Sequence, residues 1–127
     1  MKQKTKNILI ILGLVMLVVG LIALVWYSTR PKPVSAEIER LSLCLKEKGV
    51  TMYGTYWCQH CINQKKAFGS SFKSIPYVEC TEKEKECTAL GVAGYPTWIF
   101  ADGTKLSGVQ EFKTLADKAG CQFPIKN

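Results

Sequence analysis

Two of the six cysteines, Cys58 and Cys61, are separated by two residues and stand where a predicted strand and turn lead into a helix. Free backbone N–H groups and the helix dipole at a helix start favour a thiolate, which makes Cys58 the attacking sulfur. Cys61 follows one turn later on the same face, close enough to displace a mixed disulfide formed by Cys58. The pair therefore predicts thiol–disulfide exchange.

The residues around this pair favour the same chemistry. His60 is a positive or hydrogen-bonding neighbour that would stabilise the Cys58 thiolate and make the disulfide more oxidising. Gln59 and Trp57 are the other residues expected to tune the redox properties. The Cys-x-x-Cys spacing alone is a weak signal, because metal sites and structural disulfides share it. Trp57 and the later sequence Gly94-Tyr95-Pro96-Thr97 strengthen the redox interpretation.

The elements that must hold the pair are indicated by the residue pattern downstream of residue 35. Apolar residues recur at helical spacing in some segments and form short runs in others, and glycines follow most of the helices. Asp102-Gly103 is a strong hairpin signal. The expected order is α-β-α-β-α-β-β-α, with helices at 36–48, 59–68, 87–90 and 111–119 and strands at 50–53, 75–80, 98–100 and 105–106.

A dithiol at a helix start, with a later Pro opening a strand, resembles the thioredoxin fold over about residues 36–120. The fold class implied is an α/β thioredoxin-like fold preceded by one transmembrane helix. In that family the Pro has a cis peptide bond and packs against the dithiol, a role that falls on Pro96. The backbone of Tyr95 would pair with an extended substrate, and Thr97 belongs to the same substrate-binding segment.

A narrower likeness lies in four segments, which are similar to the thioredoxin-like domain associated with bacterial and plant vitamin K epoxide reductase homologues. These segments are 52–61, 64–69, 76–80 and 94–98. In that family the domain exchanges disulfides with a quinone-reducing four-helix membrane enzyme and carries an extra cysteine pair, matched here by Cys80 and Cys87. This chain has one predicted membrane helix in place of five, so a quinone-reducing partner would be a separate protein.

The chain departs from thioredoxin in its acidic residues. Thioredoxin places a buried acid in the strand before its dithiol, whereas residues 50–57 contain no carboxylate. Glu79 is a possible substitute, although an acidic residue at a strand end is more often solvated.

Four further cysteines lie outside the dithiol. Cys80 and Cys87 are interpreted as a structural disulfide, with a second redox relay or half of a zinc site as alternatives. A zinc set made of this pair and the dithiol lacks the repeated short spacing of a zinc ribbon. The helices at 36–48 and 111–119 are expected to have their C-terminal ends at the same end of the domain, which permits a Cys44–Cys121 disulfide. The two helices themselves are expected on different faces of the sheet.

An uncharged, largely apolar run of 20 residues, Ile8 to Tyr27, has the length of a bilayer core. It predicts an uncleaved membrane anchor. The alternative is a cleaved signal peptide at Val34-Ser35-Ala36, which lies nine residues beyond the run. Three lysines precede the run and Arg30 and Lys32 follow it, which favours a cytoplasmic N-terminus and an extracytoplasmic domain.

The 127 residues support one folded domain behind this anchor. The expected parts are a basic flank at 1–7, the transmembrane anchor at 8–27, a Pro-containing linker at 28–35 and the thioredoxin-like domain at 36–127. Five of the 17 basic residues flank the anchor without an acid among them, so the formal charge of +7 does not indicate nucleic-acid binding. A freely soluble cytosolic protein is also disfavoured.

The leading hypothesis is a single-pass cell-membrane thiol–disulfide oxidoreductase, with oxidation as the favoured direction. Its partners would be cysteine-containing substrate proteins and a separate membrane quinone reductase, and no cofactor or metal is expected. One alternative keeps the fold as a disulfide-stapled binding or scaffold module without redox turnover. Another is a zinc-binding domain.

Overall fold

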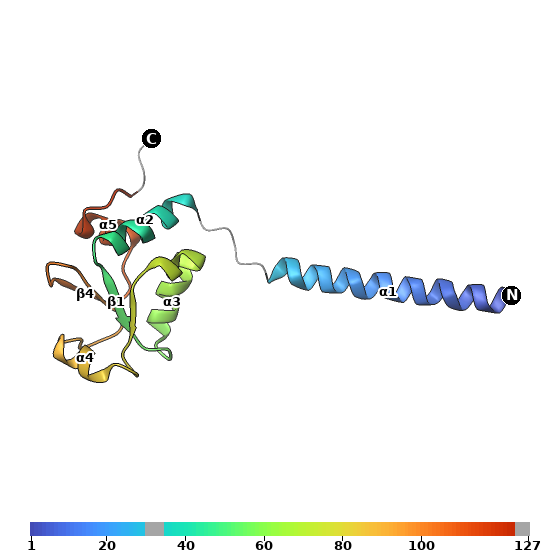
Figure 1. Cartoon of the computed structure of the whole chain (residues 1–127), viewed down its shortest axis with the longest axis horizontal. Helices are drawn as coiled ribbons and strands as arrows, with labels where there is room; N and C mark the ends of the chain where they lie inside the picture. The colour runs from blue at the N-terminus through green and yellow to red at the C-terminus, as the bar shows by residue number, and fades with distance from the viewer. Residues whose placement is uncertain (30–34, 124–127) are drawn as a thin grey trace. The chain divides into compact units, whose positions relative to one another are not determined.

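A computed structural model describes residues 1–29 and 35–123 of the chain (Figure 1). The chain divides into two compact units, Met1–Lys32 and Pro33–Asn127. Of the predicted linker, residues 30–34 lie outside the described residues. The mixed α/β class with one long apolar N-terminal helix is confirmed.

The first unit contains helix α1, Lys2–Ser28, which is longer than the predicted anchor at both ends. No side chain of α1 is buried within the chain. Its length and hydropathy are sufficient to cross a membrane. A helix that is apolar on all sides and is not buried in a protein core is suited to a lipid environment.

The second unit is built on a four-stranded sheet with the order β2-β1-β3-β4. Strand β1 pairs in parallel with β2 and antiparallel with β3, and β3 pairs antiparallel with β4. The strands are β1 Thr51–Gly54, β2 Tyr77–Glu79, β3 Thr97–Ile99 and β4 Lys105–Ser107. The helices are α2 Ala36–Glu47, α3 Gln59–Phe68, the 3-10 helix η1 Gly69–Ser74, α4 Glu84–Ala89 and α5 Phe112–Ala119.

The sheet separates two cores of unequal size. Met52 of β1 and its partner Trp98 of β3 face the larger core, which also receives side chains from α2, α3 and α5. The next residues along the strands, Tyr53 and Ile99, belong to a smaller core. Side chains alternate between the two faces of a strand, so the two cores lie on opposite faces of the sheet. Helix α3, which carries Cys61, lies on the face of the sheet covered by the larger core.

The prediction that the first and last helices of the folded domain, α2 and α5, lie on different faces of the sheet is wrong. Leu45 of α2 and Leu115 of α5 are both fully buried in the larger core, and Figure 1 shows the two helices side by side. The short helix α4 is left to cover the other face, with Cys87 packed in the smaller core. A Cys44–Cys121 disulfide joins α2 to the second residue beyond α5, with Cα atoms 6.1 Å apart.

Other differences are local. The predicted strand at 75–80 is shortened to 77–79, because η1 runs up to Ser74 and Pro76 has no N–H to donate to a strand partner. Helix η1 was not predicted. Helix α4 spans Glu84–Ala89 and so begins three residues before the helix predicted at 87–90.

Candidate active site at the start of helix α3

Cys58 is the N-cap residue of α3, the position at which the chain arriving from β1 turns into the helix. Its Sγ atom accepts a hydrogen bond from the backbone N–H of Cys61 at 3.2 Å. Both cysteines are free thiols. Both residues are buried, Cys58 with 7% of its surface exposed and Cys61 with 0%, so Cys58 is the less enclosed of the two. The N-terminal N–H groups of a helix favour negative charge at this sulfur.

The segment before β3 lies against Cys58. The Cys58 thiol donates to the carbonyl oxygen of Tyr95 at 3.6 Å, and the Tyr95–Pro96 peptide bond is cis. Pro96 is fully buried, and the Thr97 hydroxyl donates to the carbonyl of Gly94 at 2.7 Å. The structure therefore brings Tyr95 and Pro96 together with the dithiol, although they stand more than 30 residues away in the sequence.

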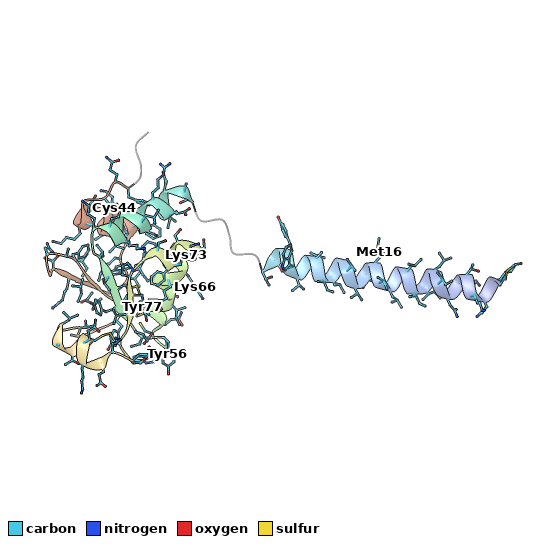
Figure 2. The ribbon with its side chains drawn as sticks, viewed as in Figure 1. Met16, Cys44, Tyr56, Lys66, Lys73 and Tyr77 are labelled. Atoms are coloured by element: carbon cyan, nitrogen blue, oxygen red, sulfur yellow. A yellow bond between two sulfur atoms is a disulfide. The ribbon has the colours of Figure 1, made fainter. Side chains whose placement is uncertain are left out.

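Two exposed aromatic side chains directly precede Cys58 in the chain. Tyr56 is 71% exposed and Trp57 is 62% exposed. The Trp57 ring meets the Tyr95 ring edge-on, with centroids 6.2 Å apart. Figure 2 labels Tyr56 near the end of the domain where the chain enters α3. Large apolar groups left in solvent around a reactive atom are suited to contact with another chain.

The other two residues expected to tune the dithiol lie on the surface. His60 and Gln59 are both exposed, and the Gln59 amide donates to the side chain of Asn63 at 2.9 Å. The structure therefore places both beside the dithiol without burying them. Their influence on redox potential stays a prediction.

Cys61 lies in a setting that opposes its ionisation. Its pKa is raised to about 12, first by burial and then by its hydrogen bond with Cys58. The backbone of Thr55 and the charge of Lys65 act in the opposite direction. Cys61 is therefore a thiol at neutral pH.

Gly54, the last residue of β1, makes room for the buried sulfur. A Cβ atom at this position would lie 2.8 Å from Cys61 Sγ and 3.3 Å from an edge carbon of the Tyr77 ring. Real Cβ atoms do not approach other atoms so closely. A strand is predicted at 50–53 with no functional role for Gly54, although a glycine four residues before Cys58 was the available signal.

Three side chains form a connected group next to Gly54. The Tyr77 hydroxyl donates to Glu79 at 2.7 Å, and the Lys65 ammonium lies 3.5 Å from the centroid of the Tyr77 ring. Burial raises the pKa of Tyr77, and the hydrogen bond to Glu79 raises it further. Glu79 is half-buried, and although desolvation acts to raise its pKa, hydrogen bonds from Tyr77 and Thr81 lower it overall. It is therefore an anion at neutral pH and a poor proton acceptor for the Cys61 thiol.

The second cysteine pair is close to the same strand end. Cys80 and Cys87 form a disulfide buried with Tyr53 in the smaller core, and the Cys80 N–H donates to the Gly54 carbonyl at 2.8 Å. Because these sulfurs are bonded to each other, they are not ligands of a four-cysteine zinc site. Within residues 1–29 and 35–123, no group of three or more His, Cys, Asp or Glu side chains is arranged to hold a metal ion.

Comparison with known proteins relates part of the chain to a protein named for thiol–disulfide chemistry. No protein-family model matches the chain. The chain is 40% identical over 92 residues to a protein of Arabidopsis thaliana named thiol-disulfide oxidoreductase LTO1. The match covers 65% of this chain and 24% of that relative, so the chain corresponds to about a quarter of the relative's length.

Proposed function

We propose that this chain is a thiol–disulfide oxidoreductase with a thioredoxin-like fold, held by α1 in the cell membrane with its N-terminus cytoplasmic and its folded domain extracytoplasmic. The observation that carries the proposal is the position of Cys58. Its sulfur caps α3, faces the Tyr95 carbonyl before a cis-Pro, and has Cys61 directly behind it. The name of the Arabidopsis relative describes the same activity.

The geometry supports exchange in two steps. In the oxidising direction, a substrate thiolate attacks Cys58 Sγ of a Cys58–Cys61 disulfide, and Cys61 leaves as a thiolate that takes a proton from solvent. A second substrate thiolate then attacks the substrate sulfur of the mixed disulfide and releases the Cys58 thiolate. The substrate loses two electrons and two protons, and the dithiol is reduced. Cys58 is the outer sulfur in both steps because Cys61 is enclosed.

The substrate in this proposal is an extended segment of a cysteine-containing protein. The backbone of Tyr95 offers hydrogen-bonding groups for strand addition next to Cys58. Trp57 and Tyr56 provide exposed aromatic surface on the same side. Backbone pairing with aromatic contact favours peptides by conformation more than by sequence, which suits an enzyme that serves several proteins.

The electron acceptor that restores the disulfide would be a separate, quinone-linked membrane oxidase such as a vitamin K epoxide reductase homologue. This part of the proposal rests on the resemblance of residues 52–61, 64–69, 76–80 and 94–98, and on a helix able to hold the domain near a membrane. Anchoring both proteins in one membrane raises the local concentration of each for the other.

The central experiment traps the exchange intermediate. In membranes that contain Cys61→Ala, the mixed disulfide with substrate has no resolving thiol, so adducts that dithiothreitol releases are expected to accumulate. They should be missing when Cys58 is also replaced by Ala. Adducts that persist in the double variant, or none in the single one, would contradict the proposal.

A measured reduction potential decides between oxidase, reductase and scaffold. About −120 to −200 mV is expected for a disulfide donor, and a value near −270 mV indicates a reductase. A structural staple, the alternative role, would lie below about −300 mV and resist mild reductants.

A further inference from the structure

Cys61 must carry negative charge during exchange, whichever direction the reaction takes. The residue is fully buried, and its sulfur lies against Gly54 and interacts with the side chain of Cys58. Charge in such a place is costly unless a group of opposite sign lies near. The helix start favours the sulfur of Cys58, which caps it, more than that of Cys61 in the first turn. Another source of positive charge is needed for Cys61.

Lys65 is the basic residue placed to supply it. It follows Cys61 by four positions on α3, so the two side chains leave the same face of the helix, one turn apart. The ammonium lies 3.5 Å from the centroid of the Tyr77 ring and 5.5 Å from that of Phe72. An ammonium over two aromatic rings is held in place at a small cost in hydration.

The Tyr77 ring connects this ammonium to the dithiol. The point at which a Gly54 Cβ would stand is 2.8 Å from Cys61 Sγ and 3.3 Å from the ring edge, so the sulfur and the ring border the same space. The Tyr77 hydroxyl lies 3.4 Å from the same point and donates to Glu79 at 2.7 Å, which fixes the ring there. The Lys65 ammonium is therefore held against the Tyr77 ring, which is itself fixed next to Cys61.

We propose that Lys65 is a positioning residue for the Cys61 half of the exchange. Its ammonium, seated on the Tyr77 ring, stabilises the Cys61 thiolate as that thiolate forms. This inference deepens the proposed function and rests on it. Glu79, the carboxylate of β2, accepts hydrogen bonds from Tyr77 and Thr81 and orients the Tyr77 ring.

The step that Lys65 assists is the attack of Cys61 on a mixed disulfide, and it needs no further oxidant or reductant. In a mixed disulfide between Cys58 and a thiol compound, Cys61 loses its proton to solvent and attacks Cys58 Sγ. The Cys58–Cys61 bond forms, the bond to the compound breaks, and the compound leaves as a thiolate. Lys65 neither gives nor takes a proton, and its contribution is the field at the Cys61 sulfur. The electrostatic contribution to the Cys61 pKa has this sign.

The test uses the full chain in detergent and 5,5′-dithiobis(2-nitrobenzoate) as the probe. Reaction of the probe with Cys58 releases one thionitrobenzoate, and attack by Cys61 on the resulting mixed disulfide releases a second. The rate of the second release measures the step assigned to Lys65. The matched variants are Lys65→Met, Lys65→Arg and Lys66→Met, since Lys66 is an exposed neighbour on the same helix (Figure 2).

Lys65→Met is expected to slow the second release about fivefold or more at neutral pH. Lys65→Arg should restore most of the rate, and Lys66→Met should leave it within about twofold, because its charge is solvated. Circular dichroism and thermal unfolding check that each variant is folded. A folded Lys65→Met protein that matches Lys66→Met in the second release overturns the inference. An unfolded one is replaced by Lys65→Gln, to which the same criterion applies.

The wild-type protein separates this inference from the proposed function. If wild type releases only one thionitrobenzoate, Cys61 does not resolve mixed disulfides and the proposed function fails. If wild type releases both and Lys65→Met does so equally fast, the inference about Lys65 alone is wrong.

Discussion

The side-chain amide of Gln64 bonds to both backbone groups of Gln110. Its Oε1 atom accepts from the Gln110 N–H at 2.7 Å, and its Nε2 atom donates to the Gln110 carbonyl at 3.1 Å. Two residues earlier, the Gly108 N–H donates to the Pro96 carbonyl at 2.7 Å. The loop between β4 and α5 therefore holds α3 and the cis-Pro segment at the same time. Both halves of the candidate site are fixed by one loop.

Replacement of Gln64 by Leu should destabilise the domain. The new side chain fills a similar volume but leaves the Gln110 N–H and carbonyl without their partner, at a cost of about 1 to 3 kcal/mol. Urea unfolding of Gln64→Leu and of Lys66→Met as a surface control measures this. Equal midpoints in the two variants would show that the loop is held by other contacts.

Gly54→Ala should be destabilising because of the Cys61 sulfur in particular. The added methyl group would lie 2.8 Å from Sγ, and overpacking of this kind typically costs about 1 to 3 kcal/mol. The penalty should shrink when Cys61 is also replaced by Ala, since the sulfur is then missing. The four proteins of this cycle are compared by denaturant unfolding. A penalty that is unchanged in the Cys61→Ala background would assign the effect to the strand backbone instead.

The reduced protein should lose stability at high pH because of Cys61. Its pKa is raised from 9.0 to about 12, so between these values the unfolded chain has released a proton that the folded chain still holds. Stability then falls as pH rises through that window. Tyr53 and Tyr77 also have raised pKa values and act in the same direction above their usual range near 10.

The contribution of Cys61 is isolated by difference. Unfolding free energies are measured for reduced wild type and for Cys61→Ala at several values between pH 8 and about pH 11, and the gap between the two proteins should narrow as pH rises. A constant gap would mean that Cys61 titrates alike in the folded and unfolded chain.

The two disulfides should differ in their effect on stability. Cys44 and Cys121 are 77 residues apart in sequence and Cys80 and Cys87 only 7, so the longer loop restricts the unfolded chain more. Loop entropy predicts losses of about 4 to 5 kcal/mol for Cys44→Ser with Cys121→Ser, and about 2 to 3 kcal/mol for Cys80→Ser with Cys87→Ser. Denaturant unfolding of the two double variants tests the order, and a larger loss for the shorter loop would contradict it.

Features set by local sequence were predictable. The order of helices and strands follows from apolar periodicity and from glycines at helix ends, and Gly69, which ends α3, has the positive φ of 56° that glycine allows. The position of Cys58 at a helix start also followed from the chain alone. The predicted elements agree with the structure except at their bounds and at η1.

Features that depend on packing between distant segments were not predictable in the same way. Helix α5 has one apolar side, but nothing in its own residues says which face of the sheet it covers, and it joins α2 through Leu45 and Leu115. The contact between the Lys65 ammonium and the Tyr77 ring joins α3 to β2. No periodic pattern in the sequence indicates such a contact. Such contacts are visible only once the sheet order is known.

The enclosure of Cys61 has a consequence for traffic through the proposed enzyme. Because Cys61 is fully enclosed and Cys58 is less so, a protein that delivers oxidising equivalents and a protein that receives them must both react at the Cys58 sulfur, one after the other. The two complexes exclude each other, so the enzyme binds its two partners alternately at one site. Throughput would then depend on how quickly each partner departs, and weak, brief binding by exposed aromatic side chains becomes an advantage.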